Sequence, residues 1–326
     1  MQTLIVTPNE AGQRLDKLLA KYMNQAGKGF LYKMMRKKNI TLNGKKCDGS
    51  ERLDEGDEIR LFLADETIEK FTGGVEKKPI SGYYPKPDII YEDSHILVVN
   101  KPAGLLSQKA REDDTSLNEA ILNYLIDSGH MPVEQLRTFR PSICNRLDRN
   151  TSGLVVAGRS LAGLQVMNAV FKDRSIHKYY QCIVKGIIEE KQLIAGFLRK
   201  DEAANTVEIY PLEVEDSVPI MTEYLPLARG GGFTRLQVTL ITGRSHQIRA
   251  HLASIGHPIL GDFKYGDRAL NEAMKKRYGL RSQLLHSWKL VMPEDLAAPL
   301  DYLAGREFFA PLPERFVQVL EGEKIR

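Results

Sequence analysis

Asp148 is the residue whose sequence surroundings most favour chemistry. It lies in the polar string R-L-D-R-N-T-S-G, residues 146–153, between the apolar pair Ile143–Cys144 and the strand-like residues 154–156. An Asp beside Thr, Ser and Gly is most often a turn or cap residue, because its carboxylate accepts hydrogen bonds from nearby backbone amides. Here Arg146 and Arg149 flank the Asp, and a second unusual polar segment follows at residues 242–266. A turn residue and a catalytic carboxylate are therefore both open interpretations.

The second segment combines a helix pattern with a group of polar side chains. Ile248, Leu252 and Ile255 have the spacing of one buried helical face, which Gly256 can end. We expect the remaining surface of the helix to carry the polar side chains Arg244, His246, Gln247, Arg249 and His251. Arginines suit phosphodiester recognition, because a guanidinium binds phosphate through two parallel hydrogen bonds.

A metal site is the alternative for the same segment, with His246, His251, His257 and Asp262 as ligands. His246 and His251 are five residues apart, whereas two histidines on one helical face are four apart. The spacing disfavours a metal centre, and we assign Arg244 and His246 to substrate binding instead.

Two long motifs carry a resemblance to a known family. The strings R-L-D-x-x-T-S-G and T-G-R-S-H-Q-I-R-x-H-L…G-H-P-I-L-G-D…Y-G resemble the signatures of the RluA-type pseudouridine synthases, which isomerise uridine in RNA. The string K-P-A-G at residues 101–104, whose expected role is structural, is a further landmark of that family. The resemblance covers about residues 13–320. It departs at Asn145, where the family usually has His, and at Cys182 and Ser287, where Ala is usual.

The resemblance implies a role for five residues. Asp148 is the catalytic carboxylate, and Arg249 is the basic residue paired with it. Arg146 enters the helical stack in place of the flipped-out base, and Tyr180 stacks on that base. Leu285 packs near the aromatic ring of Tyr180.

These implied roles agree with the chemistry of the reaction. A uridine inside folded RNA must leave the stack, at a cost of a few kcal/mol. Breaking the C1′–N1 bond builds positive charge on the sugar, which a carboxylate can stabilise or attack. The detached uracil is retained, turned and rejoined through C5, so the isomerisation requires no metal or nucleotide cofactor.

Two short helices are expected near the N-terminus. Residues 15–22 place apolar side chains at the helical spacing i, i+3, i+4 and i+7, and after a Gly-containing break we expect a second helix over residues 30–38. On the second helix Lys33, Arg36 and Lys37 share one face, while the apolar side chains turn toward a core: Leu31, Met34 and Met35.

A hairpin is expected after these helices. Residues 40–42 alternate like a strand, and Asn43-Gly44 is a strong turn signal. Residues 53–59 then form a turn that leads into a last strand. This order resembles the S4 RNA-binding domain over about residues 13–62, including its R-L-D start and L-x-x-G-D end. The RNA-binding residues that we expect here are Lys33, Arg36, Lys37, Lys45 and Lys46.

Positive charge is concentrated in this module. Residues 17–46 contain nine basic residues and no acidic one, although the whole chain carries a net charge of only +4. Such a stripe is typical of a surface that binds a polyanion. A solvated basic face without a partner is the alternative.

The rest of the chain predicts a mixed fold. We expect strands near residues 89–91, 96–99, 154–156, 178–186 and 235–240, and helices at residues 117–126 and after the candidate N-cap Ser160. The predicted class is α+β. It comprises a small S4-like α/β RNA-binding domain at residues 1–63, a linker at residues 64–87, part extended and part flexible, and a largely antiparallel-sheet catalytic domain at residues 88–326.

Composition narrows the functional classes. The chain has 326 residues and suits two domains. It has no apolar run near 18 residues and no secretory signal pattern. Cys47, Cys144 and Cys182 show no disulfide or zinc pattern and indicate reduced thiols. We therefore expect a cytoplasmic monomer without a membrane partner.

The expected partner is structured RNA. Synthases of this type with an S4-like domain mostly resemble modifiers of large-subunit ribosomal RNA, so 23S ribosomal RNA or its precursor is the first expectation and transfer RNA the alternative. A non-catalytic RNA-binding or ribosome-assembly factor is the other alternative. Such a factor is expected to have lost at least one of Asp148, Tyr180 and Arg249, and all three are present.

Overall fold

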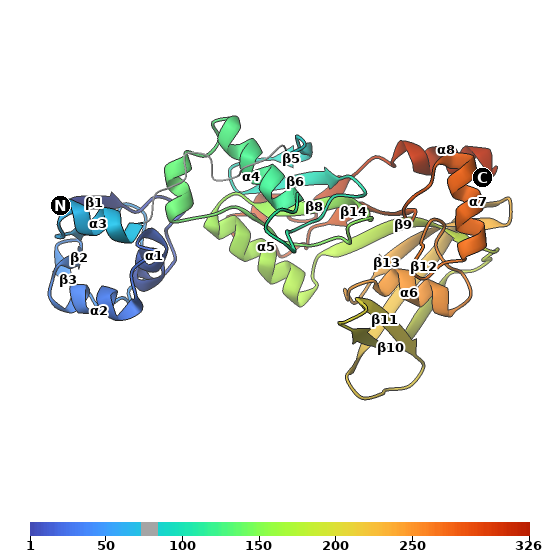
Figure 1. The fold of residues 1–326 in the computed structure, drawn as a ribbon, viewed down its shortest axis with the longest axis horizontal. Helices are drawn as coiled ribbons and strands as arrows, with labels where there is room; N and C mark the ends of the chain where they lie inside the picture. Colours follow the sequence, from blue (N-terminus) through green and yellow to red (C-terminus); the bar gives the residue numbers. More distant parts are fainter. Residues whose placement is uncertain (73–83) are drawn as a thin grey trace.

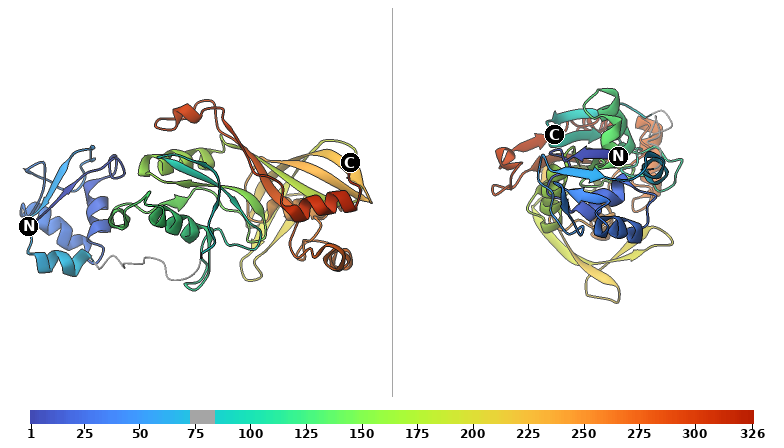
Figure 2. Two further views of the ribbon diagram at one scale, coloured as in Figure 1. Left: turned by 90° about the horizontal axis from the view of Figure 1, so that it is seen from above. Right: turned by 90° about the vertical axis from the view of Figure 1, so that its left-hand side faces the viewer.

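The computed structural model describes residues 1–72 and 84–326. The first 72 residues form a small unit at one end of an elongated molecule, and a large mixed sheet fills the rest (Figure 1). Figure 2 shows the same arrangement from two further sides. In the residues that the structure describes, no helix is long and apolar enough to cross a membrane.

The small unit is built on a four-stranded antiparallel sheet. The strand order is β1 (Gln2–Ile5), β4 (Glu58–Leu61), β2 (Ile40–Leu42) and β3 (Lys45–Lys46). Asn43 and Gly44 both have positive φ, 49° and 71°, as a two-residue hairpin turn between β2 and β3 requires. The predicted hairpin is confirmed.

Two helices pack on this sheet through the residues that their spacing predicted. Helix α1 (Leu15–Tyr22) has the expected bounds, and α2 (Lys28–Arg36) begins and ends two residues before the expected range. The buried side chains are Leu15, Leu18, Leu19 and Tyr22 of α1 and Leu31, Met34 and Met35 of α2. Lys33, Arg36 and Lys37 are exposed, as are Lys45 and Lys46 on the hairpin.

The predicted linker begins instead with a helix, α3 (Asp65–Thr72). Its Ile68 is buried in the core of the small unit, and the ring of Phe71 lies 4.6 Å from that of Phe30. The backbone amide of Gln25 also donates to the carbonyl of Phe71. An eight-residue helix depends on such tertiary packing more than on propensity, which is why local pattern missed it. The remainder of the predicted linker, residues 73–83, lies outside the described residues.

The large sheet has eleven strands and is antiparallel except for one pair. Its main path runs in the order β11-β10-β12-β13-β9-β14-β8-β6-β5, with β15 paired to β14 and β7 paired to β8. The parallel pair is β14–β8. The bounds are β5 (Asp88–Glu92), β6 (Ile96–Lys101), β7 (Ser142–Ile143), β8 (Ser152–Gly158), β9 (His177–Lys185), β10 (Gln192–Asp201), β11 (Thr206–Tyr210), β12 (Ser217–Gly230), β13 (Phe233–Leu240), β14 (Leu285–Val291) and β15 (Glu307–Phe309). The predicted mixed, largely antiparallel architecture is confirmed.

The central strands β6 and β8 contribute side chains to two hydrophobic cores, one on each face of the sheet. Leu97 and Val99 belong to the core beneath α4 (Leu117–Asp127), whereas Ile96 and Val98 belong to the core beneath α5 (Leu161–Asp173). Because successive strand residues point to opposite faces, a strand covered on both faces is apolar throughout. The Ser160 hydroxyl accepts from the amide of Gly163 and caps α5, as predicted.

The remaining described helices are three α-helices in the C-terminal half of the chain and two short 3-10 helices. They are α6 (Gln247–Ser254), α7 (Arg268–Tyr278) and α8 (Glu314–Gly322), together with the short 3-10 helices η1 (Val133–Arg137) and η2 (Asp301–Leu303). Helix α6 packs beside β11 and β12. This position brings the N-terminal end of α6 to the loop between β7 and β8 that contains Asp148.

Candidate active site

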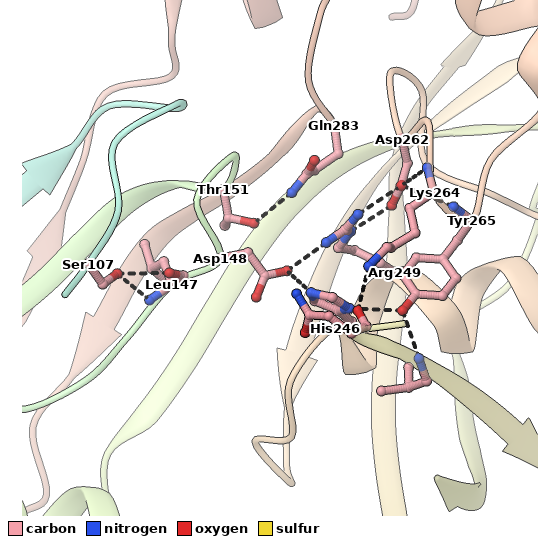
Figure 3. Close-up of polar contacts among 12 residues, drawn as sticks. Ser107, Leu147, Asp148, Thr151, His246, Arg249, Asp262, Lys264, Tyr265 and Gln283 are labelled. Atoms are coloured by element: carbon pink, nitrogen blue, oxygen red, sulfur yellow. Dashed lines mark hydrogen bonds and ion pairs between the residues drawn. The ribbon is translucent and has the colours of Figure 1, made fainter. Parts of the chain in front are cut away.

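Asp148 lies in an open cleft of about 700 Å³. The cleft is bounded by the loop of residues 146–151, which we call the Asp148 loop, by the start of α6, and by side chains of β9 and β14. Figure 3 shows Asp148 beside His246 and Arg249. The two sequence segments that carry the resemblance therefore meet in one place, although about a hundred residues separate Asp148 from Arg249.

The Asp148 loop is braced from the segment that follows β6. The Ser107 hydroxyl donates to the carbonyl of Leu147 at 2.8 Å and accepts from the amide of Leu147 at 3.0 Å. The amide of Gly104 donates to the carbonyl of Arg149 at 2.9 Å. Within the loop, the amide of Thr151 donates to the carbonyl of Asp148. The predicted turn is confirmed, and its fixed backbone holds the carboxylate in place.

Lys101 also supports the Asp148 loop. Its side chain is fully buried, and Nζ donates to the carbonyls of Pro102, Leu105 and Arg149 at 2.9, 2.7 and 3.0 Å. Burial lowers the pKa of Lys101 to about 7, against a smaller opposing effect of the Asp148 charge. The three acceptors match the three donors of an ammonium group. Lys101 thus ties the K-P-A-G segment to the Asp148 loop, consistent with the structural role expected for that segment.

Arg249 connects Asp148 to a second carboxylate. Its Nη1 donates to Asp148 Oδ2 at 2.9 Å, and its Nε and Nη2 donate to the two carboxylate oxygens of Asp262 at 2.7 and 2.9 Å (Figure 3). The predicted pairing of Arg249 with Asp148 is confirmed. Asp262 binds the guanidinium through two hydrogen bonds, which fixes its orientation toward Asp148.

The electrostatics of this group favour the charged forms. Burial opposes ionisation of Asp262, but hydrogen bonds from Arg249 and from the amides of Lys264 and Tyr265 more than offset it, so the pKa of Asp262 is lowered. Burial likewise acts to lower the pKa of Arg249, and the two carboxylates raise it overall. Asp148 itself keeps 25% of its side chain exposed, toward the cleft.

His246 approaches the same oxygen of Asp148 as Arg249 does. Its Nδ1 is 2.8 Å from the Tyr265 hydroxyl, which also accepts from the amide of Val207 at 2.9 Å, and its Nε2 is 3.9 Å from Asp148 Oδ2. His246 has a left-handed backbone, φ 56°, at the N-cap of α6. Burial lowers the pKa of His246, against the opposing effect of the Asp148 charge. A neutral imidazole therefore faces the cleft.

Tyr180 and Leu285 form an apolar wall of the cleft. Tyr180 of β9 lies opposite Ser287 of β14, and Leu285 lies opposite Cys182, so both side chains point to the same face of the sheet. Burial raises the pKa of Tyr180 well above its usual range, so the phenol is neutral. The structure thus brings together Tyr180 and Leu285 as the resemblance implied.

The cleft is strongly basic. Seven of its lining residues are basic, namely Lys109, Arg146, Arg149, Arg174, Lys178, Arg244 and Arg249, and within the described residues its single acidic lining residue is Asp148. Arg146 and Arg244 are exposed at the cleft, where sequence reasoning expected them. The five predicted RNA-binding residues of the small unit are exposed but lie outside the cleft.

The structure corrects the expected surface of α6. Gln247, Arg249 and His251 were expected on an exposed polar face, but all three are buried. Gln247 donates to the Met221 carbonyl and the Thr222 hydroxyl, and His251 Nδ1 lies 3.0 Å from the same hydroxyl. The helix is enclosed between β12 and the cleft, so its buried polar side chains bond to β12, Asp148 and Asp262.

The four side chains considered as metal ligands have different partners. His251 faces Thr222, His257 Nδ1 lies 2.9 Å from the carbonyl of Lys185, and Asp262 binds Arg249. No cluster of three or more metal-ligating side chains occurs in residues 1–72 or 84–326. The geometry therefore gives the metal alternative no support.

Sequence reasoning missed the structural partners of the site. Asp262 was considered only as a metal ligand and Tyr265 received no role, because nothing local shows that they reach Arg249 and His246. Ser107 and Gln283 carried no signal at all; Gln283 donates to the Thr151 hydroxyl at 3.2 Å. At Asn145, a departure from the family pattern, the side chain bonds to the backbone of β8 at Leu154 and Val156.

Comparisons with known proteins agree with this arrangement. Residues 95–254 match the family described as RNA pseudouridylate synthase. The ribosomal large subunit pseudouridine synthase C of Vibrio cholerae is 28% identical over 88% of this chain and 87% of its own, and the synthase D of Haemophilus influenzae is 28% identical over 98% and 94%. The solved structure of human RNA pseudouridylate synthase domain containing 4 has a similar fold, with a TM-score of 0.59 and 20% identity over 73% of this chain and 94% of that chain.

Both signature segments meet in the cleft. Asp148 and Arg249 lie inside the matched residues and are joined by a hydrogen bond, as a shared catalytic site requires. Residues 95–254 belong to the RNA pseudouridylate synthase family, and most of the chain is similar to ribosomal large subunit pseudouridine synthases.

Proposed function

We propose that this protein isomerises specific uridines of large-subunit ribosomal RNA to pseudouridine, with Asp148 as the catalytic carboxylate. One observation carries the proposal: Asp148 is the single acidic side chain among the described lining residues of a cleft that has seven basic ones. Basic side chains attract the phosphates of RNA, and a lone carboxylate among them suits a reaction that builds positive charge on a sugar.

Asp148 acts at the sugar of the target nucleotide. Cleavage of the C1′–N1 bond leaves a cationic sugar carbon, which a carboxylate can stabilise or attack, and the uracil rejoins through C5. Arg249 orients Asp148 through one hydrogen bond, because the two hydrogen bonds to Asp262 fix the guanidinium. Atoms balance without a further reactant, since N1 gains the proton that C5 loses.

The walls of the cleft accept the flipped base. The ring of Tyr180 and the side chain of Leu285 offer an apolar surface for stacking, which offsets part of the cost of leaving the RNA helix. Arg146 is exposed, and its planar guanidinium can fill the gap left in the stack. Arg244 and His246 contact the sugar-phosphate backbone near the target.

The relatives support the choice of RNA. The two bacterial proteins described above are named as ribosomal large subunit pseudouridine synthases, and the matched regions cover most of each chain. We propose that residues 1–72 act as an S4-like module that holds the RNA through Lys33, Arg36, Lys37, Lys45 and Lys46, all of which are exposed. The protein then works as a monomer, without metal or nucleotide cofactor, in the cytoplasm where ribosomal RNA is processed.

Mapping of pseudouridines tests this proposal. Total RNA from cells with and without the gene is compared at single-nucleotide resolution, and a third strain carries the gene restored on a plasmid. The proposal expects one or a few pseudouridines in 23S ribosomal RNA to disappear on deletion and return on restoration. Loss confined to transfer RNA changes the substrate, and identical maps in the three strains contradict the proposed activity.

A further inference from the structure

A second pocket, of about 500 Å³, adjoins the cleft. The two share Asn150, Asn205, His246, Arg249 and Gln283 as lining residues, so an extended ligand can occupy both. The second pocket also contains Phe263, Lys264 and Arg281. None of its described lining residues is acidic.

Phe263 presents an aromatic ring in this pocket. Its side chain is 44% exposed, which is high for a large apolar residue, and Lys275 Nζ lies 5.9 Å from the ring centroid. Arg281 is exposed beside it, and the described residues include no hydrogen-bond or ion-pair partner for its guanidinium. An aromatic face with cations around it is the arrangement that stacks a nucleobase and attracts its phosphate.

The turn that carries Phe263 is rigid. The Asn271 side chain donates to the carbonyl of Asp262 at 2.8 Å and accepts from the amide of Gly261 at 2.8 Å. The carboxylate of Asp262 accepts from the amides of Lys264 and Tyr265 at 3.0 and 3.1 Å. Because Asp262 also fixes Arg249, the same side chain sets the position of the aromatic ring relative to Asp148.

We propose that this second pocket holds a nucleotide that flanks the target uridine in the same RNA strand. Its base stacks on Phe263, and its phosphate lies near Arg281 and Lys264. Phe263 is then a specificity-determining residue that positions the target over Asp148. This inference rests on the proposed function, since it names a second subsite for the same RNA.

The test uses a synthetic RNA fragment that spans the uridine identified by pseudouridine mapping. We measure kcat and KM for the wild type and for Phe263→Ala, Phe263→Trp and Phe309→Ala. Phe309 is the matched control: it is 46% exposed and has a lysine, Lys289, 5.3 Å from its ring centroid, but it lines neither pocket. Loss of one stacked base predicts that Phe263→Ala lowers kcat/KM by about tenfold. Phe263→Trp and Phe309→Ala are expected to stay near the wild type.

A second set of fragments replaces each nucleotide next to the target, one at a time, by an abasic residue. At one of these positions, the abasic residue should lower wild-type activity about as much as Phe263→Ala lowers activity on the intact RNA. The same abasic RNA should not lower the activity of Phe263→Ala any further, because both changes remove the same stacking contact. The proposal is overturned if Phe263→Ala stays within about twofold of the wild type. The proposal is also overturned if, at every flanking position, the activity loss from Phe263→Ala and the loss from the abasic residue multiply. Failure of the proposed function itself is seen separately, as absence of turnover by the wild type on the intact fragment.

Discussion

At the residue scale, the site depends on a chain of three charged side chains. Asp262 holds Arg249 with two hydrogen bonds, and Arg249 holds Asp148 with one. Asp262 is buried, whereas the side chain of Asp148 is partly exposed in the cleft. The buried carboxylate therefore serves structure and the accessible one is free for chemistry.

Asp262→Asn should strongly destabilise the folded protein at neutral pH. The variant leaves the buried Arg249 without its main counter-charge, and breaking a buried ion pair costs about 3–5 kcal/mol. Urea unfolding at pH 7 measures the loss. Asp267→Asn is the control from the next turn, and a much smaller loss is expected there because Asp267 is partly exposed.

The difference in stability between the wild type and Asp262→Asn should also depend on pH. The pKa of Asp262 is lowered in the folded state, so its contribution is fully present above its unfolded pKa of about 3.9 and is lost as the pH falls through the folded value. The difference in unfolding free energy between wild type and Asp262→Asn should therefore narrow below about pH 4. This assignment is contradicted if the difference in unfolding free energy stays constant, or widens, as the pH falls to about 2.5.

At the element scale, the site forms where the loop after β7 meets the start of α6. The parallel pairing of β8 with β14 beneath the loop requires Gly153, because a Cβ there would lie 2.2 Å from the carbonyl oxygen of Ser287. The sequence predicted β5, β6, β8, β9, β13 and α6 from apolar spacing, but not the other strands of the large sheet. It did not predict that Gln247, Arg249 and His251 are buried, since polar residues are ordinarily placed outside and their partners come from β12 and the Asp262 turn.

Helix α2 gives a prediction of its own. Replacing Lys33, Arg36 and Lys37 together with Ala should weaken RNA binding, because all three heads are exposed on the small unit. Each lost phosphate contact flattens the plot of log affinity against log salt by a little under one unit, so about two to three units in total. Turnover at saturating RNA should change little, because these residues lie outside the cleft.

The control for this variant replaces two lysines whose charges are already paired. Lys191 and Lys200 are exposed, and they bind Glu223 and Glu202 at 2.9 and 2.6 Å. Their joint replacement by Ala should leave the salt slope unchanged. An unchanged slope in the α2 variant as well means that this face does not touch RNA, and the basic stripe is then a solvated surface.

At the scale of the whole molecule, a small basic unit lies at one end of a large sheet (Figure 1), and we propose that both bind the same RNA. The sequence predicted this organisation because each unit has its own apolar pattern, and the two cores are separate in the structure. It missed α3, because Ile68 and Phe71 stabilise this short helix only by packing into the core of the small unit. It also missed Lys101, Ser107 and Gln283 as supports of the Asp148 loop, because contacts between distant segments leave no local periodicity.

Removal of metal ions tests the cofactor expectation. The isomerisation is balanced in atoms and electrons, so activity should survive exhaustive EDTA treatment and dialysis without added nucleotide. The RNA fragment is folded in monovalent salt, which separates its own need for divalent ions from that of the enzyme. Activity that is lost on chelation and restored by one specific divalent ion contradicts the expectation.

The central claim is that Asp148 is the catalytic carboxylate, and Asp148→Asn tests it most directly. The substitution keeps the shape of the side chain and removes the negative charge that the sugar chemistry needs. Pseudouridine formation in 23S ribosomal RNA from the deletion strain is measured with the purified variant, free of wild-type enzyme, beside wild type and Asp267→Asn. We expect no product from Asp148→Asn, RNA affinity within a few-fold of the wild type, and full activity from Asp267→Asn. Measurable turnover by Asp148→Asn contradicts the account.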